Sequence, residues 1–243
     1  MSARIIDGKK LSQTIFDKLT TNIELIKKKL RPPSLTVILV GDDPASKVYV
    51  EHKRKACARV GITSNINKLS KTTTEKELTS IIQTINEDEN VDGILLQLPL
   101  PAHIDKFNVI ETIKPNKDVD GLTPQNQGLL SLGTPQHIPC TPLGIMTLLK
   151  SIDYPLTGKT ACVIGRSILV GSPITKLLTQ SHATVTQIHS RTLHPKSHTQ
   201  QADVLIVAAG QPNLVDNTWI KEGAVVIDVG IHRVDGKLIG DTN

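Results

Sequence analysis

Short apolar runs alternate with longer amphipathic patterns along this chain, and this alternation restricts its fold more than any other feature. The apolar runs predict buried strands at residues 35–40, 62–69, 91–98, 160–164, 184–188, 203–208 and 224–229. Helical spacing predicts helices at 9–30, 44–60, from 75 onward, 106–113, from 142 onward and 172–180. Strands separated by helices pair in parallel through right-handed crossovers. We therefore expect an α/β protein with mainly parallel sheets.

The strands fall into two groups, which predicts two domains. Residues 114–121 have the composition of a turn, and Pro139-Cys140-Thr141-Pro142 precedes a further helix. Thr141 is expected to cap this helix and Pro142 to occupy its first position. We place the boundary at a long connecting helix, which gives an N-terminal domain of residues 1–139 and a C-terminal domain of residues 140–243.

Composition narrows the class of protein. Aromatic residues make up 2% of the 243 positions, so the core must be built from Ile, Leu and Val. No apolar segment is long enough to span a bilayer, and residues 1–10 lack the hydrophobic centre of a signal peptide. We expect a cytoplasmic protein without a membrane partner. Cys57, Cys140 and Cys162 are widely spaced, and we expect reduced thiols packed as small hydrophobic groups.

Charge and histidine content argue against two kinds of partner. The formal charge of +5 is mild, and the basic runs at 27–29 and 53–55 contain no interleaved aromatics. We therefore expect no nucleic-acid binding, although a basic balance suits substrates that carry carboxylates or phosphates. His189, His194 and His198 have intervals that could suit a metal. Pro195 and the loop composition argue against a shared helical face, so we expect no metal site.

The segment Gly165-Arg166-Ser167-Ile168-Leu169-Val170-Gly171 lies between a predicted strand and a predicted helix. It has two glycines of a G-x-G-x-x-G loop, but Ser167 holds the middle position. A helix that begins after a glycine turn offers N–H groups and a positive dipole end to phosphate. A tight turn without a ligand is the alternative.

The next predicted strand ends at His189-Ser190-Arg191-Thr192, where NAD-binding domains usually carry Asp or Glu for the ribose hydroxyls. Arg191 with Ser190 suits a 2′-phosphate instead, which favours NADP. The loops at 209–212 and 229–231 are expected to complete the rim of the nucleotide cleft.

Four side chains of the N-terminal half are candidates for a substrate site. Tyr49 and Lys53 are four residues apart and share one helical face, Gln97 lies near the end of a strand, and Asp120 lies in a loop. Open α/β sheets bind ligands at the edge where such strands end. Each residue also has a plain structural alternative: core packing for Tyr49, a solvated lysine for Lys53, a polar strand end for Gln97 and a turn former for Asp120.

Five segments, in this order, resemble a known family: DDPASKVYVEHK, GILLQLPLP, KDVDGL, PCTPLG and GRSxxVG. Together they are similar to bifunctional methylenetetrahydrofolate dehydrogenase/cyclohydrolase, often called FolD. The resemblance implies a folate-binding catalytic domain followed by a Rossmann-type NADP-binding domain. It also implies oxidation of 5,10-methylenetetrahydrofolate with NADP, hydrolysis of the methenyl product to 10-formyltetrahydrofolate, and a homodimer formed through the second domain.

The resemblance assigns roles to the candidate residues. Lys53 would move a proton in the hydrolytic step if burial lowers its pKa, and Gln97 would orient it. The ring of Tyr49 would stack on the aminobenzoyl group, and Asp120 would accept two N–H bonds from the pterin edge. The NADP site would be lined by residues of several loops: Thr141, Gly165, Arg166, Ser167, Ser190 and Ile231. The family usually has a polar residue where this chain has Ile168.

The sequence ends earlier than family members do. Those proteins continue for a few dozen residues, with a loop of the type PGGVGPMT and a helix that packs onto the first domain. A truncated sequence, a processed chain and a divergent protein remain open, and we expect lower stability for this chain alone. Two other functions also remain open: a catalytically weak folate- or nucleotide-binding protein, and a Rossmann dehydrogenase for an unrelated small acid.

Overall fold

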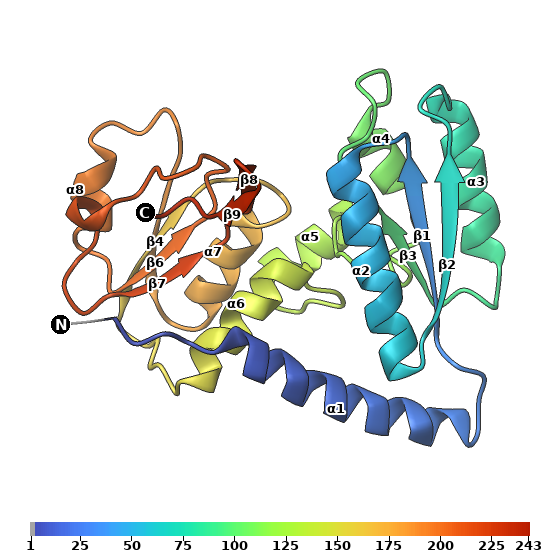
Figure 1. Cartoon of the computed structure of the whole chain (residues 1–243), viewed down its shortest axis with the longest axis horizontal. Helices are drawn as coiled ribbons and strands as arrows, with labels where there is room; N and C mark the ends of the chain where they lie inside the picture. The colour runs from blue at the N-terminus through green and yellow to red at the C-terminus, as the bar shows by residue number, and fades with distance from the viewer. Residues whose placement is uncertain (1–2) are drawn as a thin grey trace. The chain divides into compact units, whose positions relative to one another are not determined.

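The computed structural model describes residues 3–243 and divides the chain into two compact units (Figure 1). The first unit ends at Gly128, and the second runs from Leu129 to Asn243. Among the described residues, no helix combines the length and the apolar character needed to cross a membrane.

The first unit contains a three-stranded parallel sheet in the order β2-β1-β3. Its strands are β1 (Ser34–Val40), β2 (Thr63–Leu69) and β3 (Gly93–Leu96). In the central strand, Ile38 pairs with Asn67 of β2 and with Leu96 of β3. A core cluster of this unit consists of Val37, Leu39, Val50 and Leu95. The predicted parallel pairing and the reliance on aliphatic packing are confirmed here.

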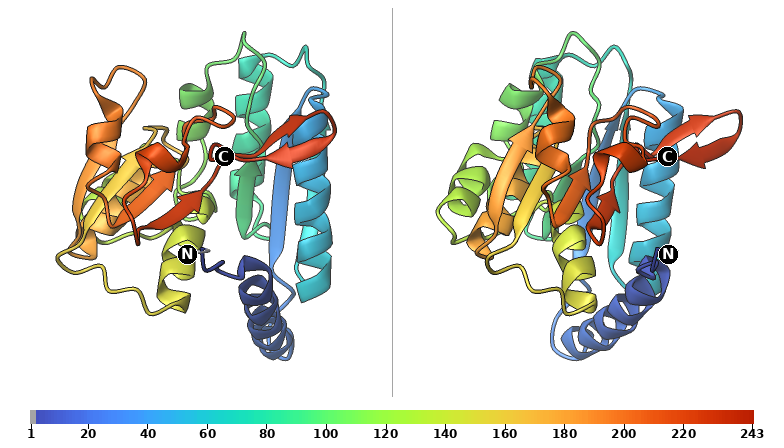
Figure 2. Two further views of the ribbon diagram at one scale, coloured as in Figure 1. Left: turned by 60° about the vertical axis from the view of Figure 1, so that its left-hand side comes forward. Right: turned by 90° about the vertical axis from the view of Figure 1, so that its left-hand side faces the viewer.

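Helices of the first unit lie where the apolar spacing predicts them. They are α1 (Gly8–Lys27), α2 (Pro44–Val60), α3 (Glu75–Glu87) and α4 (Lys106–Glu111). Helix α2, which is pale blue in Figures 1 and 2, lies against β1 and β2, and it also contacts α1. The guanidinium of Arg59 on α2 lies 4.4 Å from the ring centre of Phe16 on α1. Ile23 is buried on α1, whereas the apolar side chains of Ile15 and Leu19 stay exposed, so only part of the predicted apolar face is covered.

Both ends of α2 are set by local sequence. Pro44 occupies the first turn, and the side chain of Asp43 accepts a hydrogen bond of 2.7 Å from the Ser46 N–H. At the other end Gly61 adopts φ +85°, a left-handed conformation that glycine adopts without steric strain. The predicted start and stop of this helix are therefore confirmed.

Removing the cap of α3 should lower stability measurably. The Thr74 hydroxyl accepts from the Glu77 N–H at 3.2 Å, and the Glu77 carboxylate accepts from the Thr74 N–H at 2.8 Å. Thr74→Ala removes one half of this capping box, so we expect the free energy of unfolding to fall by about 1 kcal/mol in urea titrations. Thr84→Ala, an exposed change inside the same helix, is the control and should be neutral or slightly stabilising. Equal effects of the two changes would contradict the capping argument.

Asp92 should make the first unit sensitive to acid. Its carboxylate accepts from Arg31 at 2.6 and 3.0 Å and from the Ser34 N–H at 2.8 Å. The Arg31 hydrogen bond, aided by Ser34 and opposed by burial, lowers the pKa of Asp92 below its ordinary value of 3.8. The stabilisation is complete above that value and is lost as the pH falls through the lower folded-state pKa.

We therefore expect the difference in unfolding free energy between the wild type and Asp92→Asn to shrink as the pH falls below 3.8. Urea unfolding at a series of acidic pH values measures this difference. A difference that stays constant across the series would refute the assignment.

The second unit contains a four-stranded parallel sheet in the order β5-β4-β6-β7. Its strands are β4 (Thr160–Ile164), β5 (Thr184–Ile188), β6 (Val204–Val207) and β7 (Val225–Asp228). Its helices are α6 (Cys140–Ser151), α7 (Gly171–Gln180), α8 (Pro195–Thr199) and the 3₁₀ turn η1 (Asn217–Trp219). Because the strands are parallel, the chain leaves all four at one common edge, which we call the carboxyl edge.

Several local predictions are wrong. Thr141 is not the cap of α6: the helix begins at Cys140, and Pro139 precedes it without a side-chain hydrogen bond. Cys140 is exposed, whereas Cys162 is buried in the core as expected and Cys57 is half-buried. Pro195 was expected to argue against a helix in this segment, but it starts the short helix α8, because proline fits the first turn of a helix.

Helix α5 (Pro124–Ser131) and the last hairpin, like the short α8 and η1, have no counterpart among the sequence predictions. Helix α5 has the sequence PQNQGLLS, which lacks the apolar spacing by which helices are recognised. The antiparallel hairpin of β8 (His232–Val234) and β9 (Lys237–Ile239) turns through Asp235 and Gly236, both at positive φ. Strands of three residues are too short to show a reliable alternation.

Candidate functional site

The first unit brings Lys53 and Gln97 together at the carboxyl edge of its sheet. Lys53 lies in the middle of α2, and its Nζ is 3.4 Å from Oε1 of Gln97, which follows β3 directly. Both side chains are half-buried. The contact joins residues 44 positions apart in the chain, and it exists because β1 and β3 are neighbours in the sheet. The reading of Lys53 as a freely solvated lysine is therefore wrong.

Gln97 is held in a fixed orientation by its surroundings. Its backbone N–H donates to the Ile38 carbonyl at 2.9 Å, which extends the β1–β3 pairing by one residue. Its side-chain Nε2 donates to the Leu98 carbonyl at 2.7 Å, and the peptide bond between Leu98 and Pro99 is cis. Because Nε2 is engaged, the amide presents its oxygen to Lys53. An amide held in this way can orient an amine without adding a charge.

Tyr49 and Cys57 flank Lys53 on the same face of α2, each one helical turn away. The side chain of Tyr49 is 46% exposed, so it does not serve core packing, and its ring is accessible to a ligand. Burial raises the pKa of the Cys57 thiol, against smaller opposing effects of Ser64 and Lys53. This face of α2 therefore carries an accessible ring, an amine and a half-buried thiol in succession.

Asp120 is half-buried in a loop that is anchored by another aspartate. Asp118 forms an isolated parallel bridge with Ile94 of β3, and the Gly121 N–H closes a turn onto the Asp118 carbonyl at 3.1 Å. This turn contains Asp120. The anchoring of this turn to β3 fixes the backbone of Asp120. That Asp120 lies close to Lys53 stays a prediction.

A buried polar network holds the Asp120 loop, and no pattern in the sequence predicts it. Asp118 is 2% exposed, and its Oδ2 accepts from the Thr123 N–H at 2.8 Å and from Asn126 Nδ2 at 2.9 Å. Asn126 is fully buried and also donates to the Pro115 carbonyl at 2.9 Å. Residues two apart in an extended segment point to the same side, so the spacing of the two aspartates in KDVDGL does not distinguish the buried anchor Asp118 from Asp120.

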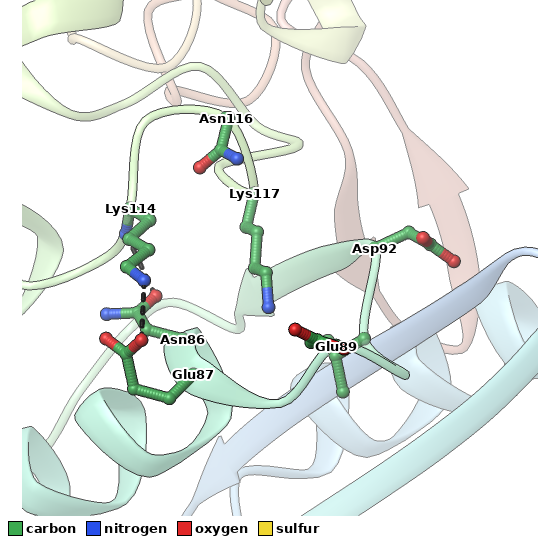
Figure 3. Close-up of a pocket in the computed structure, with 8 residues that line it drawn as sticks. Asn86, Glu87, Glu89, Asp92, Lys114, Asn116 and Lys117 are labelled. Carbon is green, nitrogen blue, oxygen red and sulfur yellow. Dashed lines mark hydrogen bonds and ion pairs between the residues drawn. The ribbon is translucent and has the colours of Figure 1, made fainter.

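A separate cavity of about 430 Å³ opens at the other end of this sheet, before β3 begins (Figure 3). Lys114 pairs there with Glu87 at 2.8 Å, and Lys117 donates to the carbonyls of Ile85 and Asp88 at the end of α3. The ammonium groups of Lys114 and Lys117 already bind protein groups, and these contacts join the end of α3 to the loop at 114–117. It contains none of the predicted site residues, and we assign it a structural role.

In the second unit the predicted nucleotide loops share the carboxyl edge of the sheet. Ile164 of β4 is in register with Ile188 of β5 and with Val207 of β6. The Gly165 N–H donates to the Ile188 carbonyl at 2.9 Å, and the Ala208 N–H donates to the Ile164 carbonyl at 2.9 Å. The loops after β4, β5 and β6 thus begin side by side, as the sequence analysis expected.

The loop after β4 is closely packed around two glycines. Gly165 adopts φ +117°, and a Cβ at this position would overlap the Ala208 carbonyl oxygen. A Cβ on Gly171, the first residue of α7, would overlap the backbone of Gly165. The start of α7 is therefore held against the end of β4, where backbone N–H groups and the helix dipole favour an anion.

The remaining predicted cofactor residues are exposed. Arg166 and Ser167 follow Gly165 directly, whereas Ser190 and Arg191 lie in the turn after β5, in which the His189 N–H donates to the Thr192 hydroxyl at 2.9 Å. Ile231 is 62% exposed after β7, and Thr141 is exposed in the first turn of α6. Two guanidinium groups and a helix N-terminus at one sheet edge fit a dinucleotide that carries several phosphates.

Comparison with protein families matches both halves of the chain. Residues 6–120 match the tetrahydrofolate dehydrogenase/cyclohydrolase catalytic domain, and residues 139–243 match the NAD(P)-binding domain of the same enzymes. The Lys53–Gln97 pair lies within the first match, and the glycine turn at Gly165 lies within the second.

Individual relatives are similar over nearly the whole chain. The bifunctional protein FolD of Halothermothrix orenii is 51% identical over 242 residues, covering 99% of this chain and 86% of that protein. The crystal structure of the bifunctional enzyme FolD from Campylobacter jejuni has a TM-score of 0.97 at 45% identity, over 100% of this chain and 86% of that one.

A third relative was solved with bound ligands. The methylenetetrahydrofolate dehydrogenase-cyclohydrolase of Trypanosoma brucei, complexed with NADP cofactor and inhibitor, has a TM-score of 0.95 at 38% identity. It covers 100% of this chain and 86% of that one. From these matches, which extend across both units, we conclude that the chain belongs to the tetrahydrofolate dehydrogenase/cyclohydrolase family.

Proposed function

We propose that this protein oxidises 5,10-methylenetetrahydrofolate with NADP and then hydrolyses the methenyl product to 10-formyltetrahydrofolate. The observation that carries the proposal is the match of both units to this one family, at about 50% identity to FolD proteins over nearly the full chain. The α/β fold with two parallel sheets agrees with it. The protein would thus act in one-carbon folate metabolism.

The dehydrogenase step places a hydride acceptor beside the one-carbon bridge of the folate. NADP supplies that acceptor when it is bound. The chain contributes the binding groups: the glycine turn at Gly165 and the start of α7 for phosphate, and Ser190 and Arg191 for the phosphate on the adenosine ribose. We further propose that Arg166, Ser167, Ile231 and Thr141 line the same site. Neither Asp nor Glu lies in the turn 189–192, which supports NADP over NAD.

The hydrolytic step requires proton transfer at the methenyl carbon. Water adds to this carbon and loses a proton, which leaves a hydroxyl group on the carbon. The hydroxyl then loses its proton as the formyl C=O forms, and the bond from the carbon to one folate nitrogen breaks as that nitrogen gains a proton. We assign the transfer between water and nitrogen to the Lys53 amine, which Gln97 orients through its amide oxygen. The overall step consumes water and releases one proton. The amidinium cation is already electrophilic, so the chain needs to position it and to transfer the protons.

Tyr49 and Asp120 complete the proposed folate site. The exposed ring of Tyr49 offers a surface on which the aminobenzoyl group can stack, one turn from Lys53. Asp120 has a carboxylate that can accept two N–H bonds from the amino-pyrimidinone edge of the pterin. Together they would fix the one-carbon bridge relative to Lys53, and such fixed orientation accelerates reactions strongly.

Absorbance of the methenyl intermediate tests the proposal. The protein is supplied with NADP and methylenetetrahydrofolate, and we expect the absorbance of the intermediate to rise and then decay as it is hydrolysed. Binding of folate and NADP without turnover would instead indicate a catalytically weak binding protein. A protein that binds no folate would be a dehydrogenase for another small acid, and the proposal would fail.

Assembly, domain roles and location belong to the same proposal. We assign the folate-binding role to residues 1–139 and the nucleotide-binding role to residues 140–243, with a homodimer formed through the latter. Light scattering at micromolar concentration should give twice the mass of 26.4 kDa.

A cytoplasmic location is supported by the thiols of Cys57 and Cys162, which form no disulfide, because reducing compartments keep thiols in this state.

A further inference from the structure

Two carboxylates fasten the last residues of the second unit to the loops of its carboxyl edge. Asp241 is fully buried, and its Oδ2 accepts from the N–H groups of Ala209 at 2.8 Å and Gly210 at 2.9 Å. Its Oδ1 lies 2.7 Å from Nε2 of His232 on β8. A single side chain thus joins the loop after β6 to the hairpin. We call Asp241 and Asp228, with the backbone N–H groups that they accept, the carboxylate clasp.

Asp228, the last residue of β7, forms the other half of the carboxylate clasp. Its Oδ1 accepts from the Gly230 N–H at 2.8 Å and from the Asp241 N–H at 3.0 Å, and its Oδ2 accepts from the Thr242 N–H at 2.9 Å. Burial opposes ionisation of Asp228, but the hydrogen bonds from Thr242, Asp241 and Gly230 together lower its pKa. An ionised carboxylate that accepts several backbone bonds is a strong anchor.

Close packing around the clasp leaves no room for side chains at two glycines. A Cβ on Gly230 would overlap the backbone and carboxylate of Asp241, and a Cβ on Gly240 would overlap the carboxylate of Asp228. The segment that carries Asp241 is also tied at its ends, because Val215 donates to the Asp241 carbonyl at 3.0 Å and Asn243 donates to the Val215 carbonyl at 2.8 Å. The position of Asp241 is therefore determined from several sides.

We propose that Asp241 is a positioning residue for the dinucleotide site, which rests on the proposed NADP-dependent function. Ala209 and Gly210 begin the loop after β6, and Gly230 lies in the turn after β7, next to Ile231. Ligands of open parallel sheets bind at this edge. Without Asp241 the two N–H groups of the β6 loop lose their acceptor, and the loop changes conformation to find another. The rim of the nucleotide site then loses its shape.

Three variants test this proposal by calorimetric titration with NADP and by thermal melting. Asp241→Ala removes the acceptor, and we expect NADP to bind at least about tenfold more weakly, which corresponds to about 1.4 kcal/mol. Asp241→Asn keeps one oxygen for both N–H groups and turns its amide towards His232, so it should restore affinity to within about threefold of the wild type. Such a rescue would show that hydrogen bonding by the side chain, and not its negative charge, maintains NADP affinity.

Asp203→Ala is the matched control at the opposite edge of the same sheet. Asp203 precedes β6, and its carboxylate accepts from the Thr160 N–H at 3.0 Å and from Lys221 at 2.6 Å. Its removal should lower the melting temperature and leave NADP affinity unchanged. If loss of stability alone weakened NADP binding, both aspartate-to-alanine variants would bind NADP more weakly. A positioning effect weakens NADP binding only in Asp241→Ala.

The outcomes are separable. If Asp241→Ala binds NADP as the wild type does, or if Asp203→Ala weakens binding as much, the positioning role is overturned while the proposed function stands. An Asp241→Asn variant as weak as Asp241→Ala also overturns it. A wild type that binds no NADP overturns the proposed function as well. If Asp241→Ala fails to fold, a second variant, His232→Ala, removes the partner of Asp241 Oδ1. This variant should bind NADP about twofold to threefold more weakly than the wild type. Unchanged NADP affinity in His232→Ala would overturn the proposal.

Discussion

Replacing Lys53 by methionine should abolish hydrolysis of the methenyl intermediate while the protein stays folded. Methionine keeps the unbranched shape of the side chain and removes the amine, which is the proposed proton-transfer group. General acid–base groups contribute about 10²- to 10⁴-fold to rate, so the loss should be of this order. The fold should persist because the change removes a single hydrogen bond, with Nζ and Oε1 3.4 Å apart, on a half-buried side chain.

The measurement follows the methenyl absorbance directly. Lys53→Met should hydrolyse methenyltetrahydrofolate about 10²- to 10⁴-fold more slowly than the wild type, with a melting temperature close to that of the wild type. Lys55→Met is the matched control: it lies two residues further along α2, its side chain is 68% exposed, and its Nζ is 3.9 Å from Glu51. It should hydrolyse the intermediate normally. Rapid hydrolysis by Lys53→Met would refute the role assigned to this lysine.

Gly165→Ala should remove NADP binding and destabilise the second unit. The residue has φ +117°, a conformation that alanine adopts only with strain, and its Cβ would overlap the Ala208 carbonyl oxygen. Backbone strain and overpacking each destabilise by about 1–3 kcal/mol, so we expect a total of about 3 kcal/mol or more. Any relaxation would separate β4 from β6 at their carboxyl ends, where the nucleotide is proposed to bind.

Gly158→Ala provides the control for backbone conformation alone. Gly158 also has a positive φ, +74°, but a Cβ there would meet no atom within 4 Å. It should lower the unfolding free energy by about 1 kcal/mol and leave NADP affinity unchanged. Urea titrations and calorimetry on the two variants separate strain from overlap. If Gly165→Ala binds NADP normally, the close packing at this turn does not serve the nucleotide site.

Much of the fold follows from local patterns in the sequence. The start of α2 at Pro44, its stop at Gly61 and the capping box of Thr74 and Glu77 each depend on neighbours within a few residues. Parallel pairing follows from the alternation of strands and helices, because a helix that packs back along the sheet returns the chain to the edge where the previous strand began. Thr141 shows the limit of this reasoning: threonine is a common N-cap residue, yet α6 begins at Cys140, one residue before it.

The candidate site could be predicted in part. Chemistry and resemblance named Lys53 and Gln97, and their contact was then found. The buried anchors were missed, because nothing in the neighbourhood of Asp118 or Asp241 shows that a distant backbone segment will donate to it. The N–H groups that donate to Asp241 belong to residues 31 and 32 positions away, and they reach it only because the fold brings the loop after β6 to the chain after β9.

Local patterns predicted the seven parallel strands, the long helices and the types of side chain available for catalysis, because propensity, capping and apolar spacing act over a few residues. Tertiary structure alone decided which of these side chains meet and which backbone groups they bind. Such contacts depend on strand order and register, as in the pairing of β1 with β3 that brings Gln97 to Lys53. A hydrogen bond requires its partners to lie within a few tenths of an ångström of the right distance, and only the packed chain sets that distance.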